Sequence, residues 1–143
     1  PFVTSRSQTS GPPRLLVVED DGNLCDLLRR MLERSGFSTA GAKNGREALL
    51  YLLSEPVDLL ITDMVMPEMD GIELMRVLQR EHPKLPIIAL SGVEDVKEYH
   101  RIAAHLGAQA ALRKPVTRAE LSSAVNAALA PRTHDVDTEE RSR

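Results

Sequence analysis

Short apolar segments alternate with longer amphipathic stretches along most of the chain. The segments with the character of strands are residues 15–18, the weaker 37–41, 57–62, 87–90, and a short stretch after Gly107 that reaches Leu112. Continuous apolar residues over a few positions are typical of strands that are buried on both faces. The pattern therefore predicts five short strands.

A helix is predicted after each strand, because apolar residues recur there at spacings of three and four. The helices are residues 23–34 before Gly36, one from a capping box of Asn44 and Glu47 to Pro56, one carrying Ile72, Met75 and Leu78 before Pro83, residues 95–106, and one from a capping box of Thr117 and Glu120 to Pro131. Five strand-then-helix units predict the α/β class, with a single doubly wound, five-stranded parallel sheet and five helices.

Both ends of the chain lack this periodicity. Residues 1–13 are rich in Ser, Thr and Pro, and residues 131–143 are charged and aperiodic. We interpret the first segment as a flexible tail or linker, residues 14–130 as one domain, and the last segment as a flexible charged tail. Because the first residue is Pro1 rather than Met, we expect a fragment or a processed chain.

Polar and ionisable side chains follow four of the predicted strands. They are Glu19, Asp20 and Asp21 after the first, Asp63 after the third, Ser91 after the fourth, and Lys114 after the fifth. The carboxyl ends of parallel strands meet at one edge of a sheet, so these side chains should converge. Clustered acids without His or Cys suit a hard ion such as Mg²⁺, while a lysine and a hydroxyl suit phosphoryl oxygens. The pattern indicates phosphoryl transfer in which Asp63 is a candidate nucleophile that forms an aspartyl-phosphate.

Composition narrows the setting of this chemistry. A chain of 143 residues with 42% hydrophobic residues can bury one core, and its net charge of −3 gives no argument for direct nucleic acid binding. No apolar run approaches the roughly 20 residues of a membrane span. The single cysteine, Cys25, has no partner for an internal disulfide, which favours a reducing compartment. We therefore expect a cytoplasmic domain without membrane insertion.

Four motifs, VVEDD, ITDMVMPEMDG, LSG and RKPV, occur in this order. In them the chain resembles the receiver domain of bacterial two-component response regulators, over roughly residues 14 to 130. The resemblance implies a CheY-like, flavodoxin-like (βα)5 fold and a role in phosphorelay signalling. It also implies a phosphodonor, the phosphohistidine of a sensor histidine kinase or of a phosphotransfer protein.

The same resemblance assigns roles to the residues at the strand ends. It implies that Asp63 is the phosphoacceptor, that Ser91 is the switch hydroxyl, and that Lys114 precedes a cis peptide bond to Pro115. The domain would be regulatory rather than an enzyme for external substrates, assisting only its own phosphorylation and dephosphorylation.

The resemblance also implies how the cofactor Mg²⁺ is held. Asp20 and Asp63 would be direct ligands, Glu19 would act through a water molecule, and the backbone carbonyl of Val65 would complete the protein ligands.

Three positions depart from the family pattern. Ala111 stands where the family often has the aromatic ring of its switch, and we interpret Tyr99 as ordinary packing rather than as a replacement. We therefore expect signalling through backbone and loop movement over residues 91–96. Val65 and Val93 are apolar where a polar side chain would help to position water, which predicts a long-lived phosphoryl group.

Two other functions remain open. A phosphohydrolase of the haloacid dehalogenase type also uses an aspartyl nucleophile after a strand, but it needs a second Asp two residues later, where this chain has Val65. A degenerate receiver acting as a binding scaffold would not need the full set of polar residues at the strand ends. We interpret Asp21 and Asp70 as helix caps and Cys25 as packing.

The output of the domain is less defined. We expect no DNA-binding output domain in this chain, because its residues after 131 include no helix-turn-helix segment. Output would then go through protein contacts with a target that the residues do not identify. The chain fits a stand-alone regulator and equally a receiver from a hybrid sensor kinase. By resemblance, the surface of the fourth helix, fifth strand and fifth helix would serve partners or a homodimer.

Overall fold

The computed structural model describes residues 11–92 and 96–130. The expectations for residues 1–10 and 131–143 of the tails, for Val93 and for a helix start at residue 95 concern residues outside this range.

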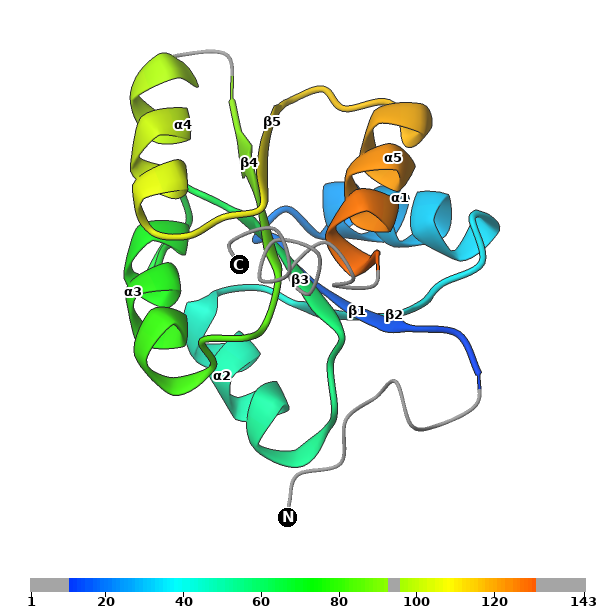
Figure 1. Ribbon diagram of the computed structural model, residues 1–143, viewed down its shortest axis with the longest axis horizontal. Helices are drawn as coiled ribbons and strands as arrows, with labels where there is room; N and C mark the ends of the chain where they lie inside the picture. Colours follow the sequence, from blue (N-terminus) through cyan, green and yellow to red (C-terminus); the bar gives the residue numbers. More distant parts are fainter. Residues whose placement is uncertain (1–10, 93–95, 131–143) are drawn as a thin grey trace, which may run out of the picture.

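Strands and helices alternate strictly along the chain (Figure 1). They are β1 (Arg14–Val18), α1 (Gly22–Arg34), β2 (Ser38–Ala42), α2 (Gly45–Ser54), β3 (Leu59–Asp63), α3 (Gly71–Glu81), β4 (Ile87–Ser91), α4 (Val96–His105), β5 (Ala110–Arg113) and α5 (Arg118–Leu129). The five strands form one parallel sheet in the order β2-β1-β3-β4-β5. The predicted fold class is confirmed.

Two strands continue further than their apolar runs predict. β3 ends at Asp63 and β4 at Ser91, rather than at residues 62 and 90. The reason is the parallel ladder, in which Asp63 lies opposite Leu90 and Ser91 opposite Arg113. Both polar residues are therefore held in register by the sheet.

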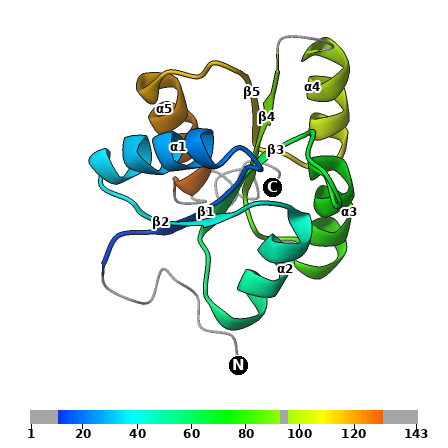
Figure 2. The ribbon, with the colours of Figure 1, turned by 180° about the vertical axis from the view of Figure 1, so that it is seen from behind.

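Helices cover both faces of the sheet (Figure 2). Leu15 and Val17 of β1 belong to a core cluster with residues of α1 and α5, whereas Leu16 and Val18 belong to a cluster with residues of α2, α3 and α4. Successive side chains of a strand point to opposite faces, so a strand covered on both sides must be apolar throughout. None of the helices in the described ranges is long and apolar enough to cross a membrane.

Most of the predicted helix caps are present. The side chains of Asp21 and Asp70 cap α1 and α3, and Thr117 forms a reciprocal capping box with Glu120 at α5.

The capping box predicted for α2 is wrong in one half. Asn44 does accept a hydrogen bond from the backbone N–H of Glu47 (2.9 Å), but the Glu47 carboxylate accepts from the N–H of Lys43 (2.9 Å) instead of Asn44. The Glu47 side chain also lies 3.8 Å from the Lys43 ammonium, which draws it one residue beyond the cap.

Candidate functional site

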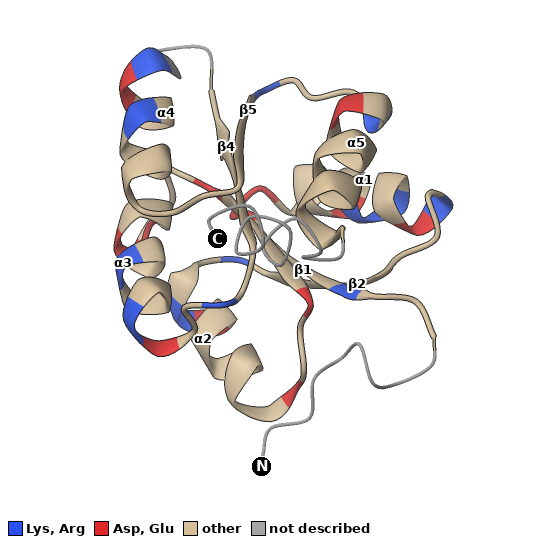
Figure 3. Ribbon diagram, in the orientation of Figure 1, with Lys and Arg blue, Asp and Glu red and all other residues tan. Residues whose placement is uncertain are grey.

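The acids after β1 and at the end of β3 lie together because these strands are neighbours. Val18 pairs with Thr62, so Glu19 and Asp63 follow at the same edge of the sheet. Carboxylate oxygens of Glu19, Asp20 and Asp63 lie within 4.8 Å of one another. In Figure 3 the acidic segment between β1 and α1 lies beside the acidic end of β3. Glu19 and Asp63 are only 3% and 5% exposed, whereas Asp20 faces solvent.

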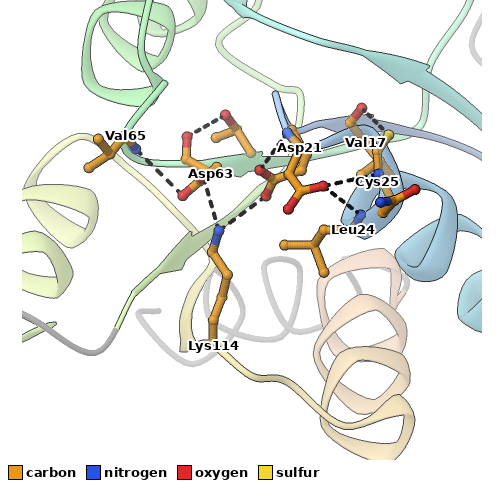
Figure 4. Close-up of polar contacts among 10 residues, drawn as sticks. Val17, Asp21, Leu24, Cys25, Asp63, Val65 and Lys114 are labelled. Carbon is orange, nitrogen blue, oxygen red and sulfur yellow. Dashed lines mark hydrogen bonds and ion pairs between the residues drawn. The ribbon is translucent and has the colours of Figure 1, made fainter. Parts of the chain in front are cut away.

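Lys114 reaches this cluster from the residue after β5. Its ammonium donates hydrogen bonds to Asp63 Oδ2 (3.0 Å) and to Glu19 Oε1 (3.2 Å). Figure 4 shows the Lys114 side chain pointing at Asp63. The Lys114 backbone N–H donates to the Ser91 carbonyl (2.7 Å), and the Lys114–Pro115 peptide bond is cis. One lysine thus connects the two buried carboxylates.

The cluster carries more negative charge than one lysine can balance. Burial, with the charge of Asp63 as a second cause, raises the pKa of Glu19 to about 7. Burial alone would lower the pKa of Lys114, but its hydrogen bond to Asp63 and the charges of Asp63 and Glu19 outweigh burial and raise that pKa. Repelling carboxylates at one site either keep a proton or recruit a cation.

This donor set fits a hard divalent cation. The three acids supply only oxygen ligands, and exposed Asp20 leaves room for water molecules. Mg²⁺ is typically bound by one or two carboxylates and keeps several waters. These residues can therefore hold Mg²⁺, as the sequence predicts.

Ser91 lies at the end of β4 with only 1% of its surface exposed. Its Oγ has no hydrogen-bond partner. Among the described residues, the only other buried side-chain atom without a hydrogen-bond partner is His100 Nε2. A buried hydroxyl without a partner is costly. A phosphoryl oxygen on Asp63, at the end of the adjacent strand, would be a partner of suitable chemistry.

The connection between β3 and α3 starts beside the acid cluster. The Val65 backbone N–H makes a long hydrogen bond to Asp63 Oδ1 (3.5 Å, Figure 4), while the Val65 side chain is 56% exposed. A Cβ on Gly71 would stand 2.2 Å from the Asp63 carbonyl oxygen, so only glycine fits there. The sequence predicts the cap at Asp70 but not this close approach of the next residue, Gly71, to Asp63.

Other residues singled out by the sequence have packing roles. Cys25 is buried, with its Sγ 3.8 Å from the Val17 carbonyl oxygen. Tyr99 is partly buried against the core cluster of α2, α3 and α4, and Ala111 pairs with Ala89 in the sheet.

An apolar groove of about 380 Å³ borders the acid cluster. One wall is α1, with Leu24, Leu27 and Met31, and the other includes Pro115 and Val116 after β5. Lys114 lines the same groove, so this one residue contacts both the groove and the buried carboxylates.

Comparison with known proteins agrees with this geometry. Residues 15–126 match the family described as response regulator receiver domain. The response regulator MprA of Mycolicibacterium vanbaalenii is 38% identical over 125 residues, which are 87% of this chain and 53% of that protein. The chain thus spans about half the length of this curated relative.

Solved structures show the same similarity. A putative response regulator from Chloroflexus aurantiacus has a TM-score of 0.79 and 30% identity, covering 84% of this chain and 99% of its own. A signal receiver domain of a signal transduction histidine kinase from Syntrophus aciditrophicus has a TM-score of 0.75 and 34% identity, covering 82% and 89%. With its doubly wound sheet, and with a family match over most of its length, this chain belongs to the family of response regulator receiver domains of two-component systems.

Proposed function

We propose that this domain accepts a phosphoryl group on Asp63 from the phosphohistidine of a sensor histidine kinase or of a phosphotransfer protein. The observation that carries the proposal is the pair of hydrogen bonds from Lys114 to Asp63 and Glu19 at the end of the sheet. A regulatory phosphoacceptor needs one buried carboxylate with a positioned cation beside it, and Asp63 has both.

In this reaction an Asp63 carboxylate oxygen attacks the phosphorus atom, the phosphorus–nitrogen bond of the phosphohistidine breaks, and the imidazole leaves. Asp20 and Asp63 would bind Mg²⁺ directly, Glu19 through water, and Val65 through its backbone carbonyl. The bound ion would neutralise charge on the phosphoryl oxygens. Lys114 pairs with the new aspartyl-phosphate, and Ser91 Oγ gains the hydrogen-bond acceptor that it lacks.

The apolar groove beside Lys114 is a suitable docking place for the phosphodonor. Leu27 of α1 lines it and is 43% exposed, so it adds apolar surface to the groove that a docked partner can cover. An amphipathic helix that presents the phosphohistidine toward Asp63 would cover Leu27.

Output would follow from movement around Ser91, because Ala111 offers no aromatic ring to move. The surface of α4, β5 and α5 would receive a target protein or a second copy. The apolar side chain of Val65 supports slow loss of the phosphoryl group.

We assign residues 14–130 to the receiver domain and residues 1–13 and 131–143 to tails. The cytoplasm is the compartment that we propose for the domain. Structures of receivers from response regulators and from a histidine kinase are both similar, so the stand-alone and hybrid-kinase settings stay open.

The two alternatives have less support. Val65 cannot act as the second acid of a haloacid dehalogenase-like phosphohydrolase. A degenerate receiver acting as a scaffold would have no use for Lys114 held between two buried carboxylates.

The direct test is the intact mass of the protein after incubation with acetyl phosphate and Mg²⁺. We expect a gain of one phosphoryl group, absent in Asp63→Asn and after chelation of Mg²⁺, and retained in Asp26→Asn, whose carboxylate is exposed on α1. If neither acetyl phosphate nor a panel of histidine kinases labels the wild-type protein, the scaffold function replaces this proposal.

A further inference from the structure

The turn between β2 and α2 contacts both segments that carry the acid cluster. The Ala42 carbonyl at the end of β2 accepts a hydrogen bond from the Glu19 backbone N–H (2.9 Å). Three residues later the Gly45 N–H donates to the Met69 carbonyl in the β3–α3 connection (2.9 Å). This turn contributes no acid to the cluster, yet it joins the backbone of one acidic segment to the backbone of the other.

The contact between Gly45 and Met69 leaves no room for a side chain. A Cβ on Gly45 would stand 2.6 Å from Met69 Cγ, 2.8 Å from Met69 Sδ and 3.0 Å from the Met69 carbonyl oxygen. Distances below about 3 Å are shorter than van der Waals contact, so any larger residue at position 45 must displace Met69. Gly45 is buried at the start of α2, where its N–H is held by the Met69 carbonyl.

The β3–α3 connection, residues 64–70, is held at both of its ends by such close approaches. At the β3 end, the Met64 carbonyl accepts a hydrogen bond from the Gly71 N–H (3.1 Å), and Gly71 lies against the Asp63 backbone. At the α3 end, Met69 is held by Gly45. Between Met64 and Met69, Glu68 has a φ of 64°, which residues with a side chain seldom adopt.

The exposed ion pair of the same region is a weaker candidate for this restraint. Arg46 lies 3.7 Å from Glu68, with both side chains mostly exposed. Such pairs contribute little to stability because water screens them. The backbone hydrogen bond and the tight packing at Gly45 are therefore the main restraint.

We propose that Gly45 and Met69 form a positioning contact through which α2 sets the place of the β3–α3 connection relative to Glu19 and Asp20. The contact fixes where the Val65 carbonyl lies, and so how well the site binds Mg²⁺. This inference rests on the proposed function for its metal, but the restraint on residues 64–70 exists in the metal-free protein as well.

A double-mutant cycle tests the contact. Gly45→Ala should weaken Mg²⁺ binding about tenfold, because residues that orient the ligands of a metal ion commonly affect its affinity by this much when they are changed. The same variant should speed amide hydrogen exchange over residues 64–71 in the metal-free protein. Met69→Ala removes the Cγ and Sδ atoms that the new Cβ meets, so Gly45→Ala should have a smaller effect in that background. Gly22→Ala is the matched control, because a Cβ there meets nothing within 4 Å and Gly22 also begins a helix.

The outcomes separate this inference from the proposed function. If Gly45→Ala lowers the melting temperature but leaves Mg²⁺ affinity and exchange over residues 64–71 unchanged, the contact is merely structural and the inference is overturned. Equal effects of Gly45→Ala with and without Met69→Ala would also overturn it. If Gly45→Ala does not fold, agreement in exchange between the double variant and Met69→Ala alone supports the contact, and faster exchange in the double variant contradicts it. Failure of the wild-type protein to accept a phosphoryl group would refute the proposed function, while the exchange comparison still decides the inference.

Discussion

Lys114 is the residue on which the charge balance of the site depends. It lies between Glu19 and Asp63, two carboxylates that are almost fully buried. Without its ammonium group these carboxylates would face each other with no positive charge in contact.

Lys114→Met should therefore lower the free energy of unfolding of the metal-free protein by about 2 kcal/mol at pH 8. This is less than the loss typical of a fully buried pair, because Lys114 is partly exposed and water screens it. Urea unfolding measures the change. Lys43→Met is the control, since its pair with Glu47 is exposed and should contribute less than about 0.5 kcal/mol. Equal losses in the two variants would show that the buried carboxylates do not depend on Lys114.

Ser91 differs from Lys114, because its hydroxyl makes no hydrogen bond within the described part of the chain. Its Oγ is buried without a partner, so Ser91→Ala should change the free energy of unfolding by less than about 0.5 kcal/mol or increase it. After phosphorylation the variant should lose the additional stability that the wild type gains. A loss of more than about 1 kcal/mol before phosphorylation would show that Ser91 Oγ is hydrogen-bonded in solution.

Among the secondary-structure elements, helix α1 both packs on the sheet and lines the apolar groove. Its buried residues Leu28 and Leu32 pack on the sheet, whereas Leu27 faces the groove beside Lys114. A substitution of Leu27 therefore changes the groove with little effect on the core.

We expect Leu27→Asp to reduce kcat/KM for phosphotransfer from a cognate histidine kinase at least about tenfold, which corresponds to about 1.4 kcal/mol of lost binding. Labelling by acetyl phosphate should be unchanged, because that small donor needs no helix contact. Leu53→Asp on α2 is the control, since Leu53 is 81% exposed and lines a different face. An equal defect with both donors would mean that Leu27 acts on the site itself rather than on docking.

For the whole molecule, metal binding at the acid cluster would be coupled to stability. The acids come from segments that only the folded chain brings together, so Mg²⁺ should bind the folded state and not the unfolded one.

Mg²⁺ at about 100 times its dissociation constant should stabilise the protein by about 2.7 kcal/mol, and a chelator should remove this gain. Thermal unfolding with and without Mg²⁺ measures the effect. Asp20→Asn should abolish the gain, and Asp26→Asn, outside the cluster, should retain it. Stabilisation that survives Asp20→Asn would place the ion elsewhere.

The fold was predictable from the sequence to a large extent, because its signals are local. Apolar runs at Leu15 and Ile87 and the caps at Asp70 and Thr117 depend on residues a few positions apart. The half-formed capping box at Asn44 shows the limit of such signals. The Glu47 carboxylate lies near both the backbone N–H and the ammonium of Lys43, a pair of contacts that the motif does not predict.

For the candidate site, the sequence by itself determined which side chains follow the strands, and its motifs determined the family. The tertiary structure alone decided the distances, because Lys114 meets Glu19 across 95 residues and only the order of strands β1, β3, β4 and β5 sets that approach. It also decided the burial of Ser91 and the close approaches at Gly71 and Gly45. Periodicity and caps report on neighbours along the chain, whereas packing between distant segments depends on the shapes of surfaces that exist only after folding.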